Sequence, residues 1–225
     1  GLKQNNISVQ AVVYLNDDVN NFTSYQEFHF VTGYFKSFID AKLISKLHVD
    51  QEPNKPEMYE YLYHMLSTAQ STTDISSTLK PLWLNERISD IWNKFSPAFR
   101  NLLEERQVLL NKTYEFSAEL FIECCSETQL MAYSNNFTIV SGYLDKYREL
   151  LSKWGRPGHP IVETGFINSL AEDQTLHYQF QTRFQETVDY VSQIDKVVVH
   201  DYKQFYSTLY CHFPDQIGPE EICIQ

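Results

Sequence analysis

A proline at position 97 separates two helical patterns, and this break constrains the fold more than any other feature of the sequence. Proline has no backbone N–H, and its ring clashes with the preceding turn, so a helix that reaches this point must end there. The acidic residues Glu104 and Glu105 follow, at a place where negative charge stabilises the start of a helix. Residues 92–112 are therefore predicted to form a helix, a tight corner and a second helix.

Apolar residues recur at steps of three and four along most of the chain, which is the period of an amphipathic helix. The predicted helices cover residues 23–48, 56–68, 82–95, 104–125, 137–154, 172–191 and 202–210, with a short helix within 161–170. Two segments have a different pattern. Residues 9–15 alternate partly like a strand but are interpreted as irregular or partly helical, and the run Val197-Val198-Val199 is predicted to be a short strand.

These elements predict an all-α fold with one domain, residues 1–225, of about eight or more helices. Residues 1–22 form an irregular N-terminal segment, and the turn-rich residues 155–160 form a loop between the N- and C-terminal groups of helices. The chain has 225 residues and is 43% hydrophobic, which is enough for a sizeable core. It has only 7 glycines and few regular turn clusters, which argues against a β-sandwich or barrel.

The proline corner also carries a resemblance to a known family. The residues at the shared spacing are Trp92, Lys94, Pro97, Phe99, Leu102, Gln107, Val108 and Leu110. This pattern resembles the signature of nuclear hormone receptor ligand-binding domains, in particular their divergent, nematode-type members. The resemblance implies a three-layer helical sandwich around an apolar pocket that accepts a small lipophilic ligand.

The resemblance also implies two sets of site residues. The ligand-binding candidates are Trp83, Ile88, Ile91, Phe116, Leu120 and Cys124. The partner-binding candidates are Lys94, Val108, Lys112 and Glu221. In the family, the two lysines hold the carbonyl end of a short coactivator helix, whose partial negative charge favours a cation. The same residues are equally compatible with ordinary core packing and ordinary surface lysines.

The sequence contains no recognisable catalytic or metal-binding motif, so the chain is predicted not to be an enzyme and to need no cofactor. Its four cysteines and seven histidines lack the spacing of a zinc site. Glu119, Glu123 and Glu127 recur at helical spacing, but without an accompanying Glu-x-x-His they are interpreted as a solvated helix face.

The resulting interpretation is the ligand-binding and coregulator-binding domain of a nuclear-receptor-like transcription factor, located in the nucleus. Its expected partners are a coactivator or corepressor helix and a second receptor chain, as a homodimer or heterodimer. The net charge of -11 argues against direct nucleic-acid binding, and no apolar run reaches membrane-spanning length. One alternative is a non-enzymatic, cytoplasmic helical scaffold or adaptor. Another is a secreted helical glycoprotein, because four Asn-x-Ser/Thr triplets occur.

Overall fold

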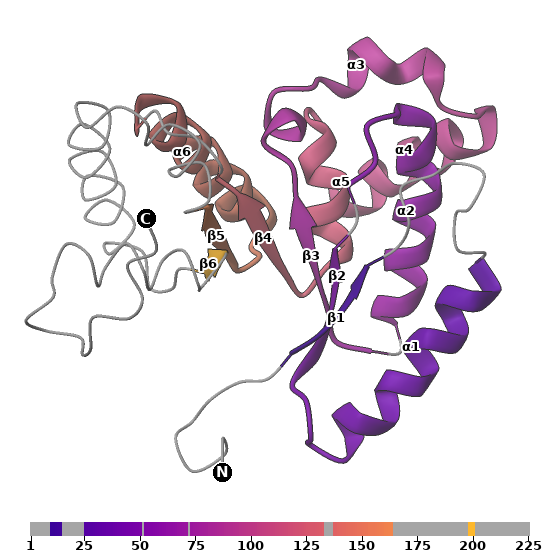
Figure 1. Ribbon diagram of the computed structural model, residues 1–225. Coiled ribbons are helices and arrows are strands. Elements are labelled where there is room, and N and C mark those ends of the chain that lie inside the picture. Colours follow the sequence, from indigo (N-terminus) through magenta and orange to yellow (C-terminus); the bar gives the residue numbers. More distant parts are fainter. Residues whose placement is uncertain are drawn as a thin grey trace, which may run out of the picture. The chain divides into compact units, whose positions relative to one another are not determined.

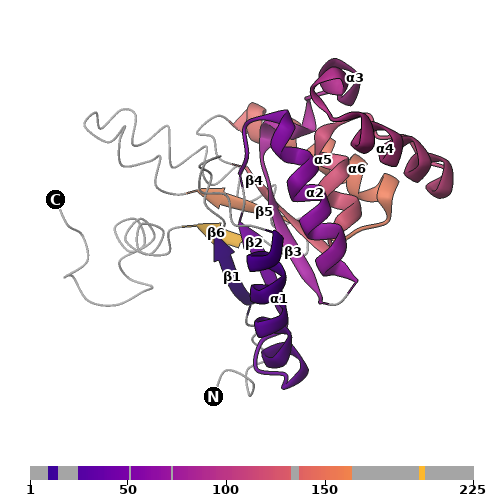
Figure 2. The same cartoon turned by 90° about the vertical axis from the view of Figure 1, so that its right-hand side faces the viewer.

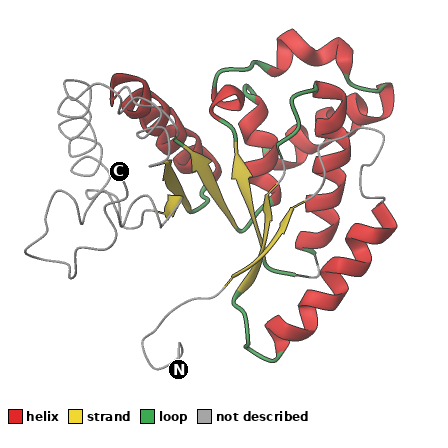
Figure 3. Cartoon of the chain, in the orientation of Figure 1, coloured by secondary structure: helices red, strands yellow, loops and turns green. Residues whose placement is uncertain are grey.

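The computed structural model describes residues 10–14, 25–50, 52–71, 73–132, 137–163 and 198–200. The chain divides into two compact units, residues 1–130 with 147–158, and residues 131–146 with 159–225. Parallel strands alternate with helices (Figure 3), so the predicted all-α fold is wrong and the chain is an α/β protein. The division into one domain or more stays a prediction.

The first unit is built on four parallel strands that follow one another in chain order. They are β1 (Gln10–Tyr14), β2 (Lys46–Asp50), β3 (Ile75–Leu79) and β4 (Glu127–Met131). Each strand pairs in parallel with the next. A parallel pair needs a crossover connection, and such crossovers are almost always right-handed, so consecutive crossovers place their helices on the same face of the sheet.

Three helices cover that face. They are α1 (Tyr25–Asp40), α2 (Pro56–Gln70) and α5 (Ser117–Cys124). Figure 1 shows them along one side of β1, β2 and β3, and in Figure 2 they lie in front of these strands. The opposite face of these strands is therefore left without a covering helix from α1, α2 or α5.

The core of the first unit lies between this helical layer and the sheet. Leu47, Val49, Ile75 and Leu79 are fully buried and point to the same side of their strands. An aromatic cluster continues the core: the ring centroid of Trp83 lies 5.7 Å from that of Tyr59 and 4.5 Å from that of Phe121. Burial of these large side chains supplies most of the stabilisation of the unit.

The long connection from β3 to β4 contains the predicted proline corner. It comprises η2 (Pro81–Leu84), α3 (Ile88–Ile91), η3 (Trp92–Lys94) and α4 (Pro97–Leu110), followed by α5. The Ser96 side chain caps α4 by accepting a hydrogen bond from the Phe99 N–H at 3.1 Å, and Pro97 begins the helix. The break at Pro97 is present, but the helices predicted on either side of it are wrong. Residues 82–95 form η2, α3 and η3 and not one helix, and the second helix begins at Pro97 and not at Glu104. The helix predicted to run to residue 125 is wrong, because Asn111 adopts a left-handed conformation (φ 50°) that ends α4 at Leu110.

The described part of the second unit contains β5 (Gly158–Glu163), β6 (Val198–His200) and the start of α6 (Phe137–Trp154). β5 and β6 are parallel, with Ile161 opposite Val198. The short strand predicted at residues 197–199 is confirmed as β6. The segment predicted as a loop, residues 155–160, is wrong from Gly158 onward, where β5 begins. None of the helices described here is long and apolar enough to cross a membrane.

Candidate functional site: the polar face of the sheet

One face of the first unit's sheet is lined by polar side chains. Because successive residues of a strand point to opposite faces, the residues between the apolar core positions share the other side. The polar residues on this side are Gln10 of β1, Lys46, His48 and Asp50 of β2, Ser76 and Thr78 of β3, and Glu127 and Gln129 of β4. The apolar Val12 of β1, opposite His48, lies on the same side. We call the eight polar residues the polar face.

A histidine occupies the middle of the polar face and is bonded through both ring nitrogens. His48 Nδ1 lies 2.9 Å from Ser76 Oγ, and Nε2 lies 2.9 Å from Thr78 Oγ1. Thr78 donates its hydroxyl hydrogen to Asp50 Oδ1 at 2.9 Å. The Thr78 oxygen must therefore accept from His48, so Nε2 carries the imidazole proton and Nδ1 accepts from Ser76.

The imidazole of His48 is held neutral by its surroundings. Burial lowers the pKa of His48, because the charged form loses its hydration. The carboxylates of Asp50 and Glu127 oppose this effect, while Lys46 adds to it. Burial thus favours the neutral form, and the hydrogen bonds select its tautomer with hydrogen on Nε2.

Further polar contacts extend this network across all four strands. Lys46 and Glu127 form an ion pair at 2.6 Å, although neither is adjacent to the other in the sequence. Gln10 Oε1 accepts from Gln129 Nε2 at 3.5 Å and also lies 3.4 Å from Ser76 Oγ, whose hydrogen is directed to the closer His48 Nδ1. Burying polar groups costs free energy even when they are paired. For folding alone, apolar residues on this face would therefore give a more stable sheet.

The position of Asp50 gives the network an accessible end. Asp50 is the last residue of β2 and is half-buried, and its partner Thr78 lies one residue before the end of β3. Lys80, just beyond β3, donates to Asn54 Oδ1 at 2.5 Å and to the Glu52 carbonyl at 3.3 Å. Parallel α/β proteins place their ligand and active sites at this carboxyl edge of the strands.

A second set of acids lies among the helices and serves packing. Glu123 accepts hydrogen bonds from Tyr63 at 3.1 Å and from Tyr114 at 3.0 Å, and it pairs with Arg106. Burial is the main reason that the pKa values of both tyrosines are raised, and the nearby Glu123 carboxylate adds to it. Glu119 is fully buried and pairs with Lys153 at 3.0 Å. The predicted solvated face of Glu119, Glu123 and Glu127 is therefore wrong.

The predicted ligand-binding residues lie mostly in the core. Trp83, Ile88, Leu120 and Cys124 are buried, Ile91 is half-buried, and Phe116 lines a separate pocket described below. The space beside Trp83 is occupied by the rings of Tyr59 and Phe121. A role in binding a lipophilic ligand stays a prediction for these residues.

Three of the four predicted partner-binding residues lie in the described part of the chain. Lys94 is exposed in η3, and Val108 is 83% exposed on α4. The Lys112 ammonium lies over the ring of Trp154, 5.0 Å from its centroid, in a cation–π contact. Glu221 lies outside the described residues. Their role in binding a helix stays a prediction.

Sequence reasoning missed the polar face because the strands that carry it were not recognised. A signal was present in Lys46-x-His48-x-Asp50, Ser76-x-Thr78 and Glu127-x-Gln129, where polar residues alternate with the period of a strand. Among the residues that the structure describes, no group of three or more His, Cys, Asp or Glu side chains is placed to hold a metal ion.

Comparison with known proteins gives matches among solved structures but none among protein families or curated proteins. The crystal structure of the Bacillus megaterium QM B1551 spore cortex-lytic enzyme SleL aligns with a TM-score of 0.45 and 13% sequence identity. The alignment covers 72% of this chain and 37% of that chain, so the chain spans well under two thirds of the enzyme. At this TM-score, the similarity carries no argument about activity.

These findings correct the interpretation drawn from the proline corner. The resemblance to nuclear hormone receptors is wrong, and so is the predicted role as a receptor domain in transcription: no family model of that kind matches, and parallel strands replace the expected helical sandwich. The prediction that the chain is not an enzyme is also corrected, because it rested on an all-helical body and the chain instead has parallel strands that alternate with helices. The nuclear location, the partners and the ligand stay untested predictions.

Proposed function

We propose that the first unit is an enzyme domain that uses the polar face as its active site and catalyses acid–base hydrolysis of an uncharged, hydroxyl-rich substrate. The observation that carries the proposal is the chain of hydrogen bonds from Ser76 through His48 and Thr78 to Asp50, which ends at the carboxyl edge of the strands. The proposal depends on this geometry and not on the similarity to SleL.

Asp50 is the residue proposed to exchange a proton with the substrate. Thr78 occupies its Oδ1, which fixes the orientation of the carboxylate and leaves Oδ2 available to a bound molecule. His48 is a positioning residue, because its Nε2–H keeps the Thr78 oxygen in place and thereby directs the Thr78 hydrogen toward Asp50. An oriented acid–base group of this kind typically contributes about 100- to 10,000-fold in rate.

The lining of the polar face supports the proposed substrate class. Carboxylate, amide and hydroxyl groups, as in Asp50, Gln129 and Thr78, form directional hydrogen bonds with hydroxyl groups of a ligand. The net charge of -11 disfavours a polyanionic substrate through long-range repulsion. A sugar-like molecule satisfies both conditions.

The test is a hydrolysis screen with chromogenic 4-nitrophenyl glycosides and esters on the purified chain, followed by variants. Asp50→Asn is expected to lower turnover by about 100-fold or more, because the amide cannot take up a proton. Asp90→Asn is the matched control, since Asp90 is exposed on α3 and is not part of the polar face. Thermal melts check that both variants remain folded.

Two outcomes would count against the proposal. Full turnover by Asp50→Asn would remove Asp50 from the mechanism. Saturable binding of a sugar without any turnover would instead identify the polar face as a carbohydrate-binding surface.

A further inference from the structure

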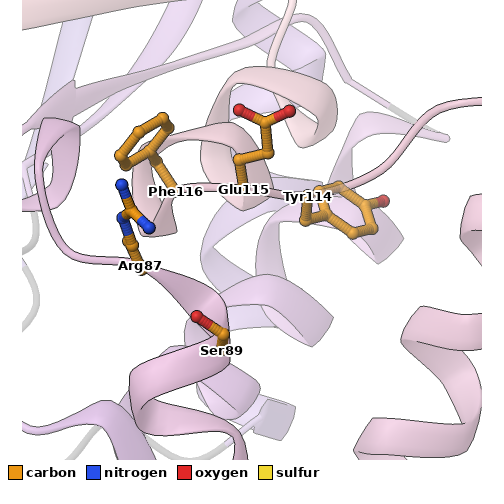
Figure 4. A pocket seen from close by; sticks show the side chains of 5 residues that line it. All are labelled: Arg87, Ser89, Tyr114, Glu115 and Phe116. Atoms are coloured by element: carbon orange, nitrogen blue, oxygen red, sulfur yellow. The ribbon is translucent and has the colours of Figure 1, made fainter.

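A cavity of about 300 Å³ lies in the long connection between β3 and β4. It is lined by Arg87, Ser89, Tyr114, Glu115 and Phe116, and Figure 4 shows their side chains around it. None of these residues belongs to the polar face. The volume is at the lower end of the range for small-molecule sites.

The two segments that form the cavity are fixed to one another by their backbones. Arg87 and Phe116 face each other in an isolated antiparallel bridge. The Ile88 N–H donates to the Glu115 carbonyl at 3.0 Å, and the Ser117 N–H donates to the Glu86 carbonyl at 2.9 Å. In this arrangement the side chains of the bridged pair are close neighbours on one side of the ladder. The guanidinium and the ring are thus presented to the same cavity.

Arg87 supplies a positive charge that the described part of the protein leaves unmatched. Its guanidinium makes no hydrogen bond or ion pair with any described residue, and the side chain is exposed. The acid in the cavity, Glu115, lies 3.6 Å from Lys153, so it is occupied by a different cation. In Figure 4 the Glu115 carboxylate points away from the Arg87 guanidinium.

The aromatic residues provide an apolar wall. Tyr114 is buried, its ring stacks on Trp154 with 5.0 Å between centroids, and its hydroxyl donates to Glu123. It is therefore a fixed part of the wall. Phe116 is half-buried, and in Figure 4 its ring lies on the Arg87 side of the cavity.

We infer that this cavity binds a small organic carboxylate with a planar apolar body. A guanidinium holds a carboxylate through two parallel N–H···O bonds, which is the geometry that arginine favours. The body of the ligand lies against Phe116. Ser89 donates to Asp90 Oδ1 at 3.1 Å, so Arg87 and not Ser89 is the principal donor.

Benzoate is the probe, because it combines one carboxylate with one planar ring. Titration of the full chain, followed by NMR chemical shifts or calorimetry, is expected to show saturable binding with a Kd of about 1 mM, typical of so small a ligand. Arg87→Gln is expected to weaken binding at least tenfold. Arg100→Gln on α4 is the matched control and is expected to bind like the unmodified chain. If Arg87→Gln does not fold, Arg87→Lys replaces it, because lysine keeps the charge but loses the paired donors.

Two further ligands separate the contributions of charge and ring. Benzyl alcohol keeps the ring without the charge, and inorganic phosphate keeps the charge without the ring. Both are expected to bind at least tenfold more weakly than benzoate. Equal binding of either ligand, equal binding of benzoate by Arg87→Gln, or no saturable binding of benzoate to the unmodified chain would each overturn the inference. Hydrolytic activity at the polar face is measured separately and does not enter this test.

Discussion

His48 and Thr78 lie on neighbouring strands, with the imidazole Nε2 2.9 Å from a threonine hydroxyl that donates its own hydrogen to Asp50. The direction of the hydrogen bonds is thereby fixed along three side chains. A histidine that is neutral and bonded on both sides keeps one tautomer and one ring orientation.

Replacing Thr78 with valine keeps the size of the side chain but removes the hydroxyl. His48 Nε2 and Asp50 Oδ1 would each lose a partner, so the free energy of unfolding is expected to fall by about 1–3 kcal/mol. Chemical denaturation measures this change, and ¹⁵N NMR of the imidazole reports the loss of the fixed tautomer. Thr113→Val, at an exposed position, is the control and is expected to change stability little. An unchanged imidazole spectrum in Thr78→Val would contradict the assigned hydrogen-bond direction.

Protonation of His48 is expected to make the protein less stable in mild acid. Burial lowers its pKa in the folded state below the ordinary value of 6.5. Between the two pKa values the unfolded chain binds more protons, so stability decreases as the pH falls below about 6.5, by at most about 1.4 kcal/mol per pH unit. Above this window the stabilisation from neutral His48 is complete.

Unfolding free energies of the unmodified chain and of His48→Gln check this expectation. They are measured from about pH 7 to about pH 5, the range in which histidine ordinarily changes its charge. The difference between them should change with pH, whereas His64→Gln, an exposed histidine on α2, should follow the unmodified chain. Glu119 changes stability with pH in the opposite direction. Burial raises its pKa, so above the ordinary pKa of 4.5 the folded state binds more protons than the unfolded chain, and stability falls as the pH rises. Its effect cancels in the comparison. Parallel curves for the unmodified chain and His48→Gln would contradict the prediction.

The pairing of Arg106 with Glu123 is expected to matter far more than a surface ion pair. Glu123 is buried and also accepts hydrogen bonds from two tyrosines. Arg106→Met therefore leaves its buried carboxylate without the positive charge that pairs with it. The expected loss is about 1.5–3 kcal/mol, less than for a fully enclosed pair because the guanidinium is partly exposed. Lys36→Met breaks the exposed pair with Asp40 and should cost only about 0.3–0.5 kcal/mol. Similar losses in the two variants, measured by denaturation, would show that Glu123 is accessible to water.

Gly158 is expected to tolerate no side chain. An added Cβ would lie 2.7 Å from Tyr147 Cζ and 2.9 Å from Leu151 Cδ1. Tyr147 cannot move aside freely, because it is buried and its hydroxyl donates to the Thr128 carbonyl at 2.7 Å. Gly158→Ala should therefore cost about 1–3 kcal/mol through overpacking.

Gly142, in the interior of α6, provides the opposite case. An added Cβ there meets no atom within 4 Å, so Gly142→Ala should stabilise the helix by about 0.5–1 kcal/mol. Thermal melts of the two variants are compared directly. Stabilisation by Gly158→Ala as well would mean that the close approach at Gly158 does not exist.

The error in fold class has a specific physical cause at β3. Ile75 and Leu79 are four residues apart, and residues at this spacing share one face both of a helix and of a strand. The residues between them, Ser76, Ser77 and Thr78, are polar and small, so the segment lacks the apolar run expected of a strand buried on both sides. The same ambiguity at Leu43 and Leu47 extended the first helix beyond its true end at Asp40.

The break at Pro97 was predictable because its chemistry is local, but the start of the following helix was placed too late, at Glu104 and not at Pro97. Ser96 and Pro97 determine the start of α4 within three residues. By contrast, the burial of Glu119 and Glu123 depends on Lys153 and Arg106, which are 34 and 17 residues away in the chain. No local sequence pattern distinguishes such buried acids from acids on a solvent-exposed helix face. The polar face of the sheet likewise depends on the pairing of strands that are distant in the sequence.

The helix α5 has all eight of its residues buried, including Cys124, and Cys125 directly after it is buried as well. Burial raises the pKa of both thiols, so neither is a reactive thiolate in the folded protein. A thiol-specific reagent can therefore modify this pair only when the segment opens, and peptide mapping of the modified pair would give the opening rate or free energy without any introduced probe. Cys124 and Cys125 can thus serve as natural probes of the local unfolding of α5.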